Sequence, residues 1–103
     1  MTSDFELSRR MVHAGSYLRG AHELERLRAR IVSGAESGAE SAHGMRFSAE
    51  RLPDDEVRLV VATRAKGDWR LYARSFFRGE DFVEVPGSDP LRGVFIGRIS
   101  SSA

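Results

Sequence analysis

The feature that most constrains the fold is a single change of apolar period along the chain. From Leu7 to Ile31 large apolar residues recur every three or four positions, which is typical of one face of an amphipathic helix. From Met45 onward apolar and polar residues alternate, as in strands with one buried face. Residues 33–44 lie between the two patterns, repeat the letters SGAE and carry no large apolar side chain. We therefore expect a helix, a flexible connector over 33–44, and a sheet.

The predicted helix covers residues 3–33 and has clear start and stop signals. Ser3 and Glu6 form a capping box, and Gly34 stands where a left-handed C-cap belongs. Gly15-Ser16 weakens the middle, so a break there into two helices is the alternative to one continuous helix. A helix of about 30 residues is about 45 Å long, whereas five strands span only about 19 Å. The overhanging end predicts a homodimer.

Five strands are predicted over residues 45–99, joined by short connections into an antiparallel meander. The five are 45–50, 57–63, 69–77, 82–85 and 94–99. A three-residue loop over 65–67 pairs Thr63 with Trp69 and places the Trp69 side chain in the core. Residues 94–99 are apolar on both faces, which predicts a strand covered on both faces, one of them by a partner chain.

The fold class is thus α+β, with a long N-terminal amphipathic helix packed on a five-stranded antiparallel meander sheet. At 103 residues the chain is a single domain, 1–103, with the sheet over 45–99 and a disordered tail over 100–103. It has no cysteine, no apolar run of membrane-spanning length and no signal-peptide core. We therefore expect a cytoplasmic protein that does not bind membranes.

Composition and spacing argue against several functions. The 16 Lys and Arg residues against 15 Asp and Glu give a net charge of +1, too small for bulk attraction to nucleic acid or anionic lipid. His13, His22 and His43 have no metal-ligand spacing, and the glycines form no phosphate-binding loop. The three adjacent acids Asp54-Asp55-Glu56 could hold a divalent cation but are most simply a hydrated turn. We expect no catalytic residue, no cofactor and no metal site.

The candidate site is the face of the central predicted strands that points away from the core. It interleaves arginines with aromatic rings, a composition that protein interfaces favour. Its residues are Arg58, Arg64, Arg70, Tyr72, Arg74, Phe76 and Arg78. With the overhanging helix and the strand that is apolar on both faces, this face predicts a small non-enzymatic interaction module. Such an adaptor, inhibitor or regulator would bind another protein and form a homo-oligomer.

Two other functions fit the same sequence. An arginine and aromatic sheet face also suits single-stranded nucleic acid or RNA, because bases stack on rings while arginines bind phosphates. The expected order of one helix followed by a meander is similar to cystatin-like and nuclear-transport-factor-like folds. That resemblance implies a pocket between helix and sheet in which a small enzyme could act.

Overall fold

The computed structural model of the chain describes residues 20–42, 44–65, 67–79, 81–87 and 89–99. It begins with a first helix, of which residues 20–32 are described. The later elements are β1 (Ser37–Ala42), β2 (Met45–Arg51), the 3₁₀ turn η1 (Pro53–Asp55), β3 (Glu56–Thr63), α2 (Trp69–Phe77), β4 (Phe82–Val85) and β5 (Arg92–Arg98). Across these ranges, the α+β class and a five-stranded antiparallel sheet are confirmed, although only four of the five predicted strands are among its members.

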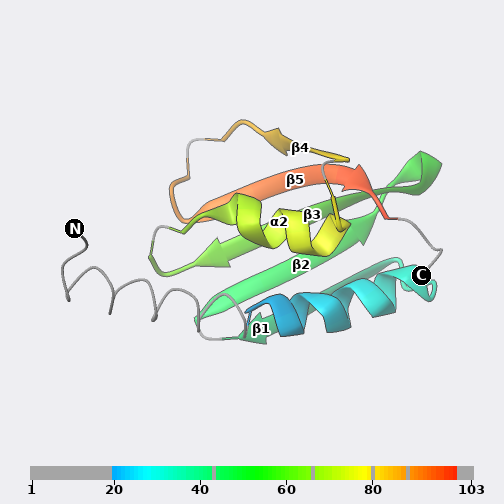
Figure 1. The fold of residues 1–103 in the computed structure, drawn as a ribbon, viewed down its shortest axis with the longest axis horizontal. Helices are drawn as coiled ribbons and strands as arrows, with labels where there is room; N and C mark the ends of the chain where they lie inside the picture. The colour runs from blue at the N-terminus through cyan, green and yellow to red at the C-terminus, as the bar shows by residue number, and fades with distance from the viewer. Residues whose placement is uncertain (1–19, 43, 66, 80, 88, 100–103) are drawn as a thin grey trace, which may run out of the picture.

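The strands form one sheet in the order β1-β2-β3-β5-β4 (Figure 1). The first three strands follow one another as hairpins, and Ala42 lies opposite Met45 at the first of these turns. The chain then passes through α2, forms β4 at the far edge and returns as β5 between β3 and β4. The predicted meander is therefore wrong after β3, because a helix carries the chain across the sheet.

Both helices pack on the same face of the sheet, which gives a two-layer domain (Figure 1). The fully buried side chains come from both layers and are led by Leu24, Leu27, Ile31, Phe47, Val57, Leu59, Val61, Phe76 and Phe95. In β2 and β3 they are every second residue, as the alternation predicts. The Phe82 ring stacks on Phe77 at a centroid distance of 5.4 Å and meets Phe95 edge-on at 5.9 Å. These ring contacts tie β4 to α2 and β5.

The first helix ends where the sequence predicts. Gly34 has a φ of +115°, and its N–H donates to the Ile31 carbonyl at 3.2 Å. Glycine adopts this backbone conformation without a steric penalty, so Gly34 closes the helix. The predicted start at Ser3, the full length of the helix and its break near Gly15 lie outside the described residues, as does the tail over 100–103.

The expected flexible connector is wrong over residues 37–42, which form the edge strand β1. Its small side chains bury little apolar area, so backbone pairing with β2 is its main support. Gly38 lets the first helix lie close to this strand, because a Cβ built there would be 3.3 Å from Leu27 Cδ1 and from Arg30 Cζ. Small residues thus suit an edge strand that lies next to a helix.

The predicted strand 69–77 is wrong, because this segment is helix α2. Asp68 caps the helix, its Oδ1 accepting from the Arg70 N–H at 3.2 Å. The buried residues recur at helical spacing, namely Tyr72, Ala73, Phe76 and Phe77. The alternation instead predicted Leu71 inside and Tyr72 outside, whereas Leu71 is 46% exposed and Tyr72 is buried.

Trp69 packs against the core from α2 and not from a strand. A Cβ built on Gly93 of β5 would lie only 2.5 Å from Trp69 Cγ, so the indole lies directly against the glycine backbone. The three-residue loop over 65–67 and the pairing of Thr63 with Trp69 are therefore wrong. Thr63 pairs with Met45 instead.

Candidate interaction surface

The outer face of the sheet, opposite the two helices, has an apolar centre. Opposed residues of an antiparallel pair lie on the same face, so Val60 lies beside Val94 there. Ile96 lies beside Val83 in the same way. We define the outer patch as Val60, Ala62, Val83, Val85, Val94 and Ile96. Val83 is 71% exposed and Val85 36%, and the other four are half-buried.

Charged side chains and shallow grooves border the outer patch. Arg58 Nη1 donates to Glu50 Oε2 at 3.0 Å across β2 and β3, and Arg92 and Arg98 stand at the two ends of β5. A groove of about 510 Å³ runs along β4 and β5, and another of about 510 Å³ runs along β1, β2 and β3. An apolar centre inside a charged rim is the usual anatomy of a protein interface.

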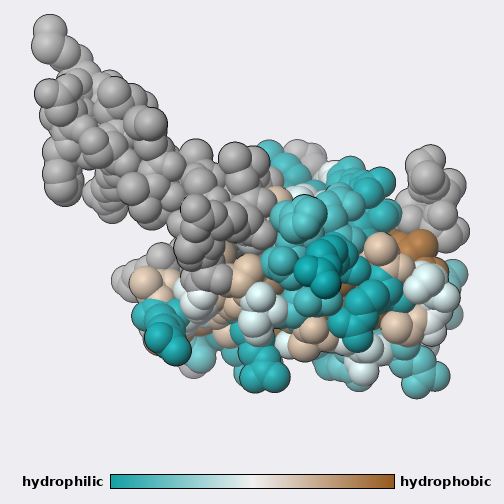
Figure 2. Space-filling model, turned by 90° about the horizontal axis from the view of Figure 1, so that it is seen from below, coloured by the Kyte–Doolittle hydropathy of each residue, from teal (hydrophilic) through white to brown (hydrophobic). Residues whose placement is uncertain are grey.

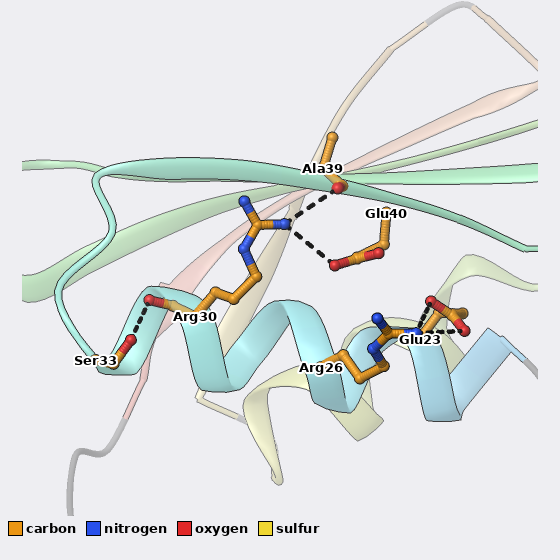
Figure 3. Close-up of polar contacts among 6 residues, drawn as sticks. All are labelled: Glu23, Arg26, Arg30, Ser33, Ala39 and Glu40. Atoms are coloured by element: carbon orange, nitrogen blue, oxygen red, sulfur yellow. Dashed lines mark hydrogen bonds and ion pairs between the residues drawn. The ribbon is translucent and has the colours of Figure 1, made fainter.

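The β1 edge of the sheet is protected by the first helix. The Arg51 N–H donates to the Glu36 carbonyl at 2.7 Å, and the alternation of the ladder then turns the backbone groups of Ala39 toward the edge. Arg30 Nη1 donates to the Ala39 carbonyl at 3.4 Å and to Glu40 Oε1 at 3.1 Å (Figure 3). A charged side chain over an edge strand opposes pairing with another strand. Viewed from this side, hydrophilic and pale residues cover most of the coloured surface (Figure 2).

The β4 edge, at the opposite side of the sheet, is open (Figure 1). The Arg98 N–H donates to the Asp81 carbonyl at 3.3 Å, so the ladder turns the backbone groups of Phe82 and Glu84 away from β5. No side chain in the described part of the chain bonds to these groups. Arg70 Nε of α2 reaches only the Glu84 carboxylate, at 3.3 Å. With respect to the described residues, this edge therefore presents free donors and acceptors beside the outer patch.

The seven predicted interaction residues do not share one sheet face, because five of them lie on α2 or at its end. Tyr72 and Phe76 are buried in the core. Arg58 is on the outer face, and Arg64 lies in the bend that follows β3. The predicted platform of exposed rings between arginines is therefore not formed. That any of these residues contacts a partner stays a prediction.

The remaining three arginines of that set lie on the helix side. Arg70 and Arg74 are exposed on α2. Arg78 follows the helix in a left-handed conformation, and its Nη2 donates to the two carboxylate oxygens of Glu25 at 2.9 and 3.2 Å. This pair links the end of α2 to the first helix.

Arg28 is a buried cation on the first helix, close to that pair. Burial lowers the pKa of Arg28 and the neighbouring Arg78 lowers it further, while Glu25 raises it. The Glu25 carboxylate thus acts on both the Arg28 and the Arg78 guanidinium groups. The cluster serves packing between the helices, on the side opposite the outer patch.

The described residues form neither a metal-binding cluster nor a membrane-spanning helix. Within the described ranges, no three His, Cys, Asp or Glu residues lie close enough together to hold a metal ion. No helix in those ranges is both long and apolar enough to cross a membrane.

Sequence reasoning identifies only part of the outer patch. It singles out β5, because apolar residues occupy both faces of that strand. It misses Val60 and Val83, although each has an apolar neighbour, Val61 and Phe82, inside an alternating segment. Two adjacent apolar residues in a strand place one of them on the solvent side, and that is the available signal.

Comparison with known proteins gives no family for this chain. The sequence matches no protein-family model, and no curated protein or solved structure matches it significantly.

Proposed function

We propose that this chain is a non-enzymatic protein-interaction module, an adaptor or regulator that binds another protein on its outer sheet face. The observation that carries the proposal is the outer patch, in which Val83 is 71% exposed at the side of an open strand edge. Contiguous apolar surface rimmed by charge is typical of interaction sites in soluble proteins. The partner chemistry that fits is an apolar segment flanked by polar groups.

Single-stranded nucleic acid fits this surface less well. Stacking of bases requires exposed rings, whereas Tyr72 and Phe76 are buried. The rim arginine Arg58 is paired with Glu50 at 3.0 Å, which reduces its attraction for phosphate. A small enzyme is also less favoured, because the fully buried Phe47, Phe76 and Phe95 occupy the space between helices and sheet where a pocket was expected. Nucleic-acid binding is kept as an outcome of the test.

The test places a photo-cross-linking residue, p-benzoylphenylalanine, at Val60 in the middle of the outer patch. The matched control carries it at Arg26, whose side chain is 62% exposed on the first helix. After irradiation in the native cells, we expect Val60 to give a discrete adduct with another protein and Arg26 to give none. Adducts with nucleic acid would favour that alternative. Equal labelling from both positions, or none from either, would overturn the proposal.

A further inference from the structure

The open β4 edge exposes the backbone N–H and C=O groups of alternate residues. In an antiparallel ladder, alternate residues direct their N–H and C=O groups to opposite sides. With Asp81 bonded to Arg98, the outward groups of β4 belong to Phe82 and Glu84. Pro86 follows the strand and has no N–H to donate, so the row ends there.

We infer that β4 pairs with β4 of a second copy of this chain, antiparallel and centred on Val83, an inference that rests on the proposed interaction function. A two-fold axis through Val83 pairs Phe82 with Glu84 of the other copy and, by symmetry, Glu84 with Phe82. Each of these two pairs exchanges two backbone hydrogen bonds. The two Val83 side chains then meet at the axis on the outer face.

Charge and backbone chemistry select this register over its neighbours. A shift that places Glu84 opposite itself sets two carboxylates side by side and brings Phe82 against Pro86, which lacks a donor. A shift that places Phe82 opposite itself sets Glu84 opposite residue 80, which is also a glutamate. The register centred on Val83 opposes no like charges. It also removes from water the most exposed large apolar side chain in the described ranges.

Two further observations favour a second copy over β4 instead of over β1. At β1, Arg30 already bonds to an edge carbonyl, that of Ala39, at 3.4 Å (Figure 3). At β4, the exposed Val83 and Val85 adjoin Val94 and Ile96 of the outer patch. Pairing there would join two five-stranded sheets and their patches into one continuous outer face. A closed two-fold contact of this kind uses the same surface of both copies and does not propagate.

The experiment uses the absence of native cysteine to read the register directly. In the variant Val83→Cys the two thiols face each other in a non-hydrogen-bonded pair, with Cα atoms about 4.5 Å apart, within the about 4.4–6.8 Å range of disulfides. The control Val85→Cys lies opposite position 81 of the other copy, so its two thiols are four residues apart, about 14 Å. Copper-phenanthroline oxidation should cross-link Val83→Cys rapidly and Val85→Cys at least tenfold more slowly.

Light scattering on the purified full chain gives an independent readout. The unmodified chain should have twice its 11.5 kDa chain mass, and Val83→Glu should fall to 11.5 kDa with an unchanged circular dichroism spectrum. The inference would be overturned if the two cysteine variants cross-link at equal rates. It would also be overturned if the unmodified chain is a monomer after 100-fold dilution from about 1 mM. If the β4 pairing test fails but Val60 still gives a protein adduct, the proposed function stands. If Val60 gives no adduct but the β4 pairing is observed, only the proposed function is overturned.

Discussion

Gly93 of β5 is a position where the addition of a single methyl group should destabilise the fold. A Cβ at this glycine would lie 2.5, 2.8 and 2.9 Å from Cγ, Cβ and Cδ1 of Trp69. The Trp69 Cβ is fixed to the α2 backbone, so a change of rotamer cannot move it away. Gly93→Ala must therefore displace the first turn of α2 from the sheet.

The size of the effect follows from two opposing contributions. Forcing an extra methyl group into a packed contact costs about 1–3 kcal/mol. Alanine restricts the unfolded chain more than glycine does, which returns about 0.4–1 kcal/mol. We expect Gly93→Ala to lower the free energy of unfolding by about 1–2 kcal/mol, a large share of the stability of a small domain.

The assay is urea unfolding followed by far-ultraviolet circular dichroism, which does not depend on the single tryptophan. Gly87→Ala is the matched control, because a Cβ there meets no atom within 4 Å. In a Trp69→Ala background the cost of Gly93→Ala should fall, since the contacts with Cγ and Cδ1 are gone, but it should not vanish, because the Cβ at position 69 remains 2.8 Å away. A Gly93→Ala protein as stable as the Gly87→Ala control would refute the packing of α2 on β5 described above.

Two further changes test the core and the helix cap by the same assay. Phe47→Ala, at a fully buried position of β2, should cost about 3–5 kcal/mol, and a loss below 1 kcal/mol would contradict the described core. Asp68→Ala should cost about 1 kcal/mol through loss of its bond to the Arg70 N–H, while Asp68→Asn should restore most of it. Equal stabilities of the alanine and asparagine variants would argue against capping.

The parts of the fold predicted correctly are those in which burial and local pattern agree. In β2 and β3, alternate residues such as Phe47 and Leu59 are buried and their neighbours are not, so a period of two identifies both strands. At Gly34, the helix end coincides with a residue that adopts positive φ freely. In these places local preference and tertiary packing point to the same structure.

The prediction for segment 69–77 is wrong because its sequence fits both the period of a strand and the period of a helix. Aromatic residues are common in strands, and alternation accounts for Trp69, Leu71 and Ala73 as one face. The helical stripe also begins at Trp69 but continues through Tyr72 and Phe76, and the Asp68 cap favours it. The predicted interaction face depends on the strand, so most of that face moves to the helix side with α2.

Strand β1 is not predicted from the sequence, for the opposite reason: its sequence has almost no periodic pattern of apolar residues. Its alternating small residues have little to bury on either face, so its position depends on β2 and on the first helix. An edge strand stabilised by its neighbours cannot be recognised from side-chain hydrophobicity alone. The Arg30 contact that protects its edge spans nine residues and follows only from the fold.

The pattern of β5 explains why the outer face, rather than the helix side, is the better candidate surface. Its inward positions are Gly93, Phe95 and Gly97, and the two glycines allow α2 and β4 to approach closely. Its outward positions include Val94 and Ile96, whereas a solvent-facing strand side is usually polar. β-Branched apolar residues on this face, opposite the two described helices, give little to the core. Burial of these side chains under another molecule would gain free energy, which supports the proposed interaction function.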